Sequence, residues 1–137
     1  MFKIKLITYC SLFLFLTGCA TPVGKMTDSD FVWHENTVNI ESSKVYTNML
    51  TSFRSCENIA AEPFLNNDHS QIILYLRNIA SVTQFVVGLV KLHEIDQNTT
   101  LVRVGIQKKY DSPLFGESGK SGKLFLSFAN KTHADCN

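Results

Sequence analysis

Three β-rich segments joined by very short connections constrain the fold of this chain more than any other feature. They span Gln71 to Leu76, Val82 to about Ile95, and Thr100 to about Lys108. β-Branched and apolar residues are abundant in all three, and few residues separate one segment from the next. Because a parallel crossover needs a dozen or more residues, connections this short predict antiparallel neighbours in a meander.

Side-chain alternation predicts which faces of these strands are buried. In the third segment the apolar residues at 102, 104 and 106 alternate with Arg103 and Gln107, which predicts one buried and one solvated face. In the second segment, residues 85–90 are apolar at both parities, so we expect a central strand covered on both sides. Candidates for the second cover are Phe64, Leu65, Phe115 and residues 124–128. The alternative is an apolar patch that docks a partner protein.

An amphipathic helix is predicted before the meander, beginning near Ser42 or Ser43. The residues at helical spacing on its apolar side are Val45, Tyr46, Met49, Leu50, Phe53 and Cys56, and those on the other side are Lys44, Asn48, Thr51, Ser52 and Ser55. This pattern predicts a helix of roughly 14 to 18 residues. Residues 37–41 alternate between apolar and polar types and predict a short strand, whereas Pro63 and residues 66–68 indicate a loop.

The C-terminal part of the chain supports two interpretations. Residues 110–122 contain Pro113 and several glycines, which predict a surface loop. Residues 124–129 alternate as a strand would, yet Leu124, Phe125 and Phe128 also share one helical face. We favour the strand. The predicted fold is therefore α+β, with one amphipathic helix packed on a four- to five-stranded antiparallel sheet.

The N-terminus has the features of an export signal. Lys3 and Lys5 precede the uncharged, mainly apolar run 6–16, which is too short for a membrane span of about 20 residues and typical of a signal peptide. The run ends in Leu16-Thr17-Gly18-Cys19, which resembles the lipobox of bacterial lipoproteins. The resemblance implies a diacylglyceryl group on Cys19, cleavage after Gly18 and acylation of the new amine. Ala20, where an aspartate would retain the protein at the inner membrane, implies the outer membrane, facing the periplasm.

These features divide the chain into a signal peptide (1–18), a lipidated flexible tether (19–32) and one α+β domain (33–137). The lipid would be the membrane contact, because two or three acyl chains hold a small domain at about 0.8 kcal/mol per buried methylene. Loss of residues 1–18 changes the formal net charge from +1 to −1, which leaves no basic excess for nucleic acid. A cytosolic domain with an apolar first strand, or a plain secretory signal, is the alternative.

Cysteine usage agrees with export. Cys10 leaves with the signal peptide and Cys19 is lipidated, so Cys56 and Cys136 remain. An even remainder in an oxidising compartment predicts one disulfide, which would close a loop of about 80 residues. A catalytic thiol is the alternative, but it would need a positioned histidine. The order of elements is also similar to that of small proteobacterial envelope lipoproteins that end in a cysteine paired with the helix.

No residue pattern specifies a catalytic, cofactor or metal site. Residues 116–121 contain Gly-Lys-Ser, but Leu114 occupies the position of the first glycine of a phosphate-binding loop. The four histidines are scattered along the sequence, and the alternative is a weak metal contact at His93 and Asp96. The Gly-x-Ser-x-Gly elbow of a serine nucleophile does not occur in the sequence. We therefore predict a non-enzymatic accessory or scaffold subunit with an envelope protein partner and no cofactor. The alternatives are a periplasmic binding module for a lipid or peptidoglycan fragment, and a hydrolase whose site forms only in three dimensions.

Overall fold

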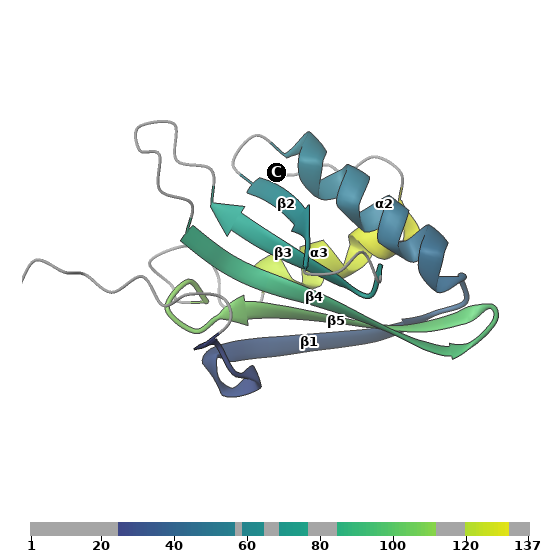
Figure 1. The fold of residues 1–137 in the computed structure, drawn as a ribbon, viewed down its shortest axis with the longest axis horizontal. Helices are drawn as coiled ribbons and strands as arrows, with labels where there is room; N and C mark the ends of the chain where they lie inside the picture. The colour runs from purple at the N-terminus through teal and green to yellow at the C-terminus, as the bar shows by residue number, and fades with distance from the viewer. Residues whose placement is uncertain (1–24, 57–58, 65–68, 77–84, 112–119, 132–137) are drawn as a thin grey trace, which may run out of the picture.

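The computed structural model describes residues 25–56, 59–64, 69–76, 85–111 and 120–131. They form one five-stranded antiparallel sheet with the strand order β1-β5-β4-β3-β2, and two α-helices (Figure 1). The strands are β1 (Phe31–Val38), β2 (Ile59–Pro63), β3 (Gln71–Leu76), β4 (Phe85–Asp96) and β5 (Thr99–Gln107). The helices are α2 (Ser42–Ser55) and α3 (Lys120–Ser127), with short 3-10 helices η2 (Asp28–Asp30) and η4 (Phe128–Asn130). The predicted α+β class and antiparallel meander are confirmed.

The strand β4 is central, as its apolar run predicts. It pairs with β3 on one side and with β5 on the other, and only residues 97 and 98 separate it from β5. The amide of Asn98 donates to the Asp96 carboxylate over 2.9 Å, which stabilises this tight turn. A register shift opposite Leu74 and Tyr75 changes the alternation in β4, so that both Val87 and Val90 join the core on the helix side.

The hydrophobic core lies between one face of the sheet and the two helices. Helix α2 contacts β2, β4 and β5, whereas α3 lies against β1 and β5. Phe53 of α2 is fully buried, and its ring meets the rings of Phe125 and Phe128 edge-on at centroid distances of 5.0 and 5.1 Å. In the part of the chain that the structure describes, no helix is both long and apolar enough to cross a membrane.

The preference for a strand at residues 124–129, and with it the prediction of a single helix, was wrong. These residues form the end of α3 followed by η4. Helical geometry brings Phe125 and Phe128 together over Phe53, whereas a strand would point them to opposite faces. The helical interpretation wins because it buries both aromatic rings in one core.

Two strands also differ from the sequence prediction. β1 runs from Phe31 to Val38, earlier than the predicted 37–41, because apolar side chains occur at both of its parities and hide the alternation. β2 was missed, since Ile59–Pro63 consists mostly of residues with low strand propensity. Among the described strands it is an edge strand paired with β3, and this position tolerates Pro63.

The polar side of α2 is not wholly exposed. Asn48 and Ser52, predicted on the solvent side, are buried at 6% and 0% relative exposure. The Asn48 amide donates to the carbonyl of Ala129 over 3.0 Å, and the Ser52 hydroxyl donates to that of Lys131 over 3.1 Å. The second helix brings this backbone to α2, so the prediction failed because it did not include that helix.

Gly122 marks a close approach of α3 to β1. A side-chain carbon there would overlap the ring of His34. We expect Gly122→Ala to destabilise the protein, because the overlap costs about 1–3 kcal/mol while alanine gains only about 1 kcal/mol in helix propensity.

A double-mutant cycle with His34→Ala tests this contact. Without the ring, only the propensity gain remains, so Gly122→Ala should become stabilising by up to about 1 kcal/mol. Denaturant unfolding of the four proteins measures the change of sign. Strictly additive effects would show that the glycine and the ring do not meet.

Candidate functional site

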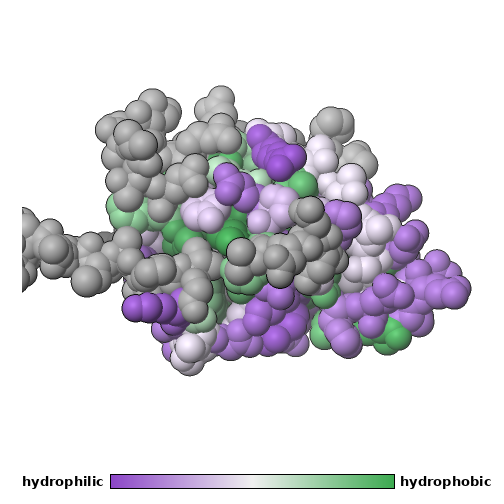
Figure 2. All heavy atoms as spheres, viewed as in Figure 1, coloured by the Kyte–Doolittle hydropathy of each residue, from purple (hydrophilic) through white to green (hydrophobic). Residues whose placement is uncertain are grey.

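The face of the sheet opposite the helices, here called the open face, carries the chemistry that distinguishes this protein. Its side chains alternate with those of the core along each strand. The main ones are Phe31, Trp33, Ile73, Val86, Leu89, Lys91 and Arg103. The expected solvated face is therefore apolar and aromatic over part of its area, and Figure 2 shows hydrophobic colour gathered over the left half of the visible surface.

Trp33 is the centre of the open face. Its ring lies on Gly105, where an added Cβ would come within 2.9–3.0 Å of three indole carbons. Lys91 and Arg103, cross-strand neighbours on β4 and β5, place their cationic groups 5.1 and 4.7 Å from the ring centroid. Gly105 thus provides the space in which the indole stacks on the sheet beside the two cations.

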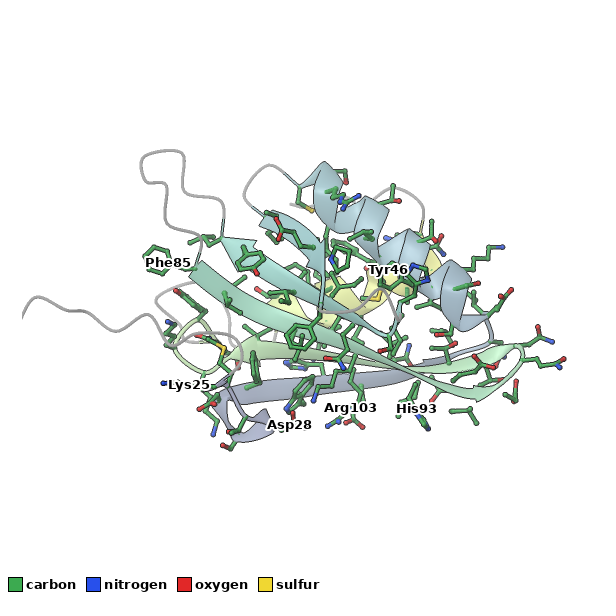
Figure 3. All side chains as sticks on the ribbon, in the orientation of Figure 1. Lys25, Asp28, Tyr46, Phe85, His93 and Arg103 are labelled. Carbon is green, nitrogen blue, oxygen red and sulfur yellow. The ribbon has the colours of Figure 1, made fainter. Side chains whose placement is uncertain are left out.

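The same residues hold the N-terminal segment on the sheet. The Trp33 indole N–H donates to the backbone carbonyl of Asp28 over 2.9 Å, and Lys91 Nζ lies 2.6 Å from the Asp28 carboxylate. Arg103 lies 2.5 Å from Glu35 and 3.9 Å from the second Asp28 oxygen (Figure 3). Such half-exposed ion pairs contribute only about 0–1 kcal/mol each. The contacts of Asp28 with Trp33, Lys91 and Arg103 instead fix the position of η2, because they join it to β1, β4 and β5.

Two further groups stabilise this segment or adjoin the open face. The Asp30 carboxylate accepts hydrogen bonds from the backbone N–H and the hydroxyl of Thr27, and these bonds lower the pKa of Asp30. The carboxylate therefore stays charged until the pH falls well into the acid range, and the cap is lost only below that point. On β3, desolvation, followed by the charge of Glu62, raises the pKa of Tyr75.

The cavities near η2 are small. One of about 210 Å³ has an apolar wall that includes Phe31, Ile73, Val86 and Leu89, and the other, of about 260 Å³, lies between Met26 and residues 107–109. Ligand pockets usually hold about 300–1,000 Å³. A third hollow of about 360 Å³ lies between β1 and α3, at the lower end of this range, and Glu35, Lys123 and Leu126 are among the residues that line it.

The described residues contain no group of three side chains that could hold a metal ion. His34 lies against α3, and the ring of His69 packs on Tyr46 at 5.0 Å. His93 is exposed on β4, near the β4–β5 turn. His133 and residues 116–119, the first part of the glycine-rich sequence that ends in Gly-Lys-Ser, lie outside the described residues.

Of the predicted site residues, only Cys56 is described. It caps the C-terminal end of α2 and is 3% exposed. Cys19 and Cys136 both lie outside the described residues. Asn48, Ser52 and Cys56 follow one another at intervals of four along α2, so the three side chains form one stripe.

We expect Trp33→Phe to loosen η2 while the sheet stays folded. Phenylalanine keeps a ring over Gly105 but lacks the N–H that bonds to Asp28, a loss of about 0.5–1.5 kcal/mol. Hydrogen–deuterium exchange at the amides of 28–30 should accelerate by up to about tenfold. Glu35→Gln is the control, because it removes an ion pair that does not include η2. Unchanged exchange in Trp33→Phe would show that the indole does not hold the segment.

Sequence reasoning considered an apolar patch on the second face of the sheet as an alternative, but it missed the contacts around Trp33 at the centre of the open face. The prediction began the domain at residue 33 and assigned Asp28 to the flexible tether, so the partner of Trp33 and Lys91 was not considered. The usable signal was the alternation Phe31, Trp33, Glu35 across from Gly105 and Arg103. Comparison of the chain with protein families, with characterised proteins and with solved structures gives no match.

Proposed function

We propose that this protein is a bacterial envelope lipoprotein, anchored by lipid on Cys19, that acts as a non-enzymatic accessory or scaffold subunit at the outer membrane. The sequence Leu16-Thr17-Gly18-Cys19 after a basic and apolar N-terminus supports the anchor. The filled core and the small cavities near η2 support a structural role over a binding module for a lipid or peptidoglycan fragment.

The observation that carries the scaffold proposal is the docking of η2 on the open face. Asp28 is bonded to Trp33 and Lys91, so the chain that leads back to Cys19 departs from a defined end of the sheet. In Figure 3, Lys25 lies at the left end of the sheet, and His93 lies right of the centre, toward the β4–β5 hairpin. Since β4 has 12 residues, the hairpin is held about 40 Å from the anchor end. This geometry suits a subunit that presents a surface at a fixed distance from a membrane.

The anchor is tested by replacing the lipidated residue. We expect Cys19→Ser to abolish incorporation of labelled palmitate and to leave the precursor uncleaved, because the thiol is the site of the first lipid transfer. Cys10→Ser is the matched control, because its cysteine belongs to the signal peptide, and it should be processed normally. Palmitate that still enters the Cys19→Ser protein would refute the lipoprotein proposal.

The accessory role is tested by capture from mildly cross-linked envelopes. The lipidated protein should retain a reproducible partner protein, and the Cys19→Ser form should lose it. Mass spectrometry identifies the partner. If the lipidated protein retains no protein but binds a radiolabelled peptidoglycan fragment, the scaffold proposal is refuted. The binding module is then the better proposal.

We further propose that Cys56 pairs with Cys136. The carbonyls of Ala129 and Lys131 bond successively to Asn48 and Ser52, so the C-terminal chain advances along α2 toward Cys56. One more turn of helix, about 6 Å, separates Ser52 from Cys56. The five residues from Lys131 to Cys136 can span up to about 17 Å, which is enough to reach it.

A further inference from the structure

We propose that the end of the sheet nearest Lys25 is a membrane-contacting surface that seats against anionic lipid head groups. This anchor-end surface consists of Leu76, Phe85, Lys25, Lys108 and Lys109. The proposal rests on the proposed lipidation of Cys19, which places a bilayer beside this end. It goes further, because it makes the domain itself a second point of attachment.

The short chain between the lipid and the fold limits what this end can face. Lys25 is six residues after Cys19, and an extended chain of that length spans about 20 Å at most. The residues that follow are docked through Asp28, so Lys25 has a defined place beside the sheet. The head groups therefore lie within about 20 Å of Lys25, and the surface at this end has a bilayer as its nearest neighbour.

An apolar pair occupies this end of the sheet. Leu76, the last residue of β3, is the register partner of Phe85, the first residue of β4. Leu76 is 37% exposed and Phe85 is half-buried, and Figure 3 shows Phe85 at the left tip of the sheet, the end where Lys25 also lies. Exposed apolar side chains next to a lipid anchor are suited to the interface between head groups and acyl chains.

Lysines accompany the apolar pair. Lys108 and Lys109 follow β5 and are exposed, as is Lys25, and the backbone N–H of Lys108 donates to the carbonyl of Asp30 over 3.0 Å. The carboxylate of Asp28 is engaged by Lys91, whereas Asp30 offsets part of the basic charge. Each lysine that reaches an anionic bilayer favours binding by about fivefold.

The opposite end of the sheet provides a natural contrast. Ile95 is the other large hydrophobic residue that is exposed in the described part of the chain, at 55%. It lies between Glu94 and Asp96, both exposed, and their charges are repelled by anionic head groups. Leu76 and Ile95 are thus both exposed, but Ile95 lies between two acidic residues, whereas Leu76 lies at the end that carries Lys25, Lys108 and Lys109.

Vesicle binding of the lipid-free mature chain tests the proposal. The chain begins at position 19 with Cys19→Ser, is exported through an ordinary secretory signal, and is sedimented with phosphatidylethanolamine–phosphatidylglycerol or with phosphatidylcholine vesicles. We expect measurable binding to the anionic vesicles and at least about fivefold less to the neutral ones. Leu76→Ser, or Lys108→Glu with Lys109→Glu, should lower binding at least about fivefold, while Ile95→Ser leaves it unchanged. Circular dichroism confirms that each variant is folded.

Three results would overturn the proposal: no binding to either vesicle, equal binding to both, or equal loss in Leu76→Ser and Ile95→Ser. If this surface captures a protein and binds neither type of vesicle, the first of these three results holds and the proposal is overturned. The palmitate experiment is independent of all three, because the vesicle assay uses a chain without lipid. A negative result for Cys19 lipidation is therefore distinguishable from a negative result for the anchor-end surface.

Discussion

Replacement of Phe53 by alanine should lower the free energy of unfolding by about 3–5 kcal/mol. Phe53 has no exposed surface, and its ring lies between Phe125 and Phe128. Truncation leaves a cavity that these two rings cannot fill unless α3 and η4 move relative to α2. The loss therefore includes the buried area of Phe53 and its aromatic contacts with the second helix.

Denaturant unfolding of the mature protein, monitored by the single tryptophan, measures this change. Ile95→Ala is the control, because Ile95 is 55% exposed and its loss should change stability by no more than about 0.5 kcal/mol. Phe53→Leu should cost less than Phe53→Ala, since most of the volume remains. A loss below about 1 kcal/mol in Phe53→Ala would show that α3 does not pack on Phe53 as the structure has it.

The sheet meander could be predicted because its information is local. Short connections require antiparallel pairing, and the alternation Val102, Val104, Ile106 identifies the core face. β1 and β2 depend on what lies beside them. Val32 and Trp33 are apolar neighbours that point to opposite faces of the sheet. Both faces of β1 can be apolar because α3 covers one of them and η2 contacts the other.

The candidate site was harder to predict, because its residues come from distant parts of the chain. Asp28 meets Lys91 across 63 positions, and Glu35 meets Arg103 across 68. Single-sequence periodicity contains no information on such pairs. Asn48 and Ser52 show the same limit, because a buried polar residue on a helix has the same spacing as an exposed one until its distant partner is known.

Loss of the proposed Cys56–Cys136 disulfide should lower the free energy of unfolding by about 4 to 5 kcal/mol. The bond would close a loop of about 80 residues, and this loop restricts the unfolded chain far more than the folded one. The native chain is already directed along α2 by the bonds to Asn48 and Ser52, so little strain should offset the gain. The effect is comparable to that of the Phe53 substitution but arises in the unfolded state.

Unfolding of Cys136→Ser and of the wild-type protein, each with and without reductant, measures this contribution. Reductant should destabilise the wild type to the level of the variant and leave the variant unchanged. The oxidised mature protein should react with no thiol reagent after denaturation. Labelling of both cysteines without reductant, or equal stability of the two proteins, would contradict the pairing. In that case the two hydrogen bonds to α2 would be the attachment of the C-terminal chain, and Asn48→Ala should then release it.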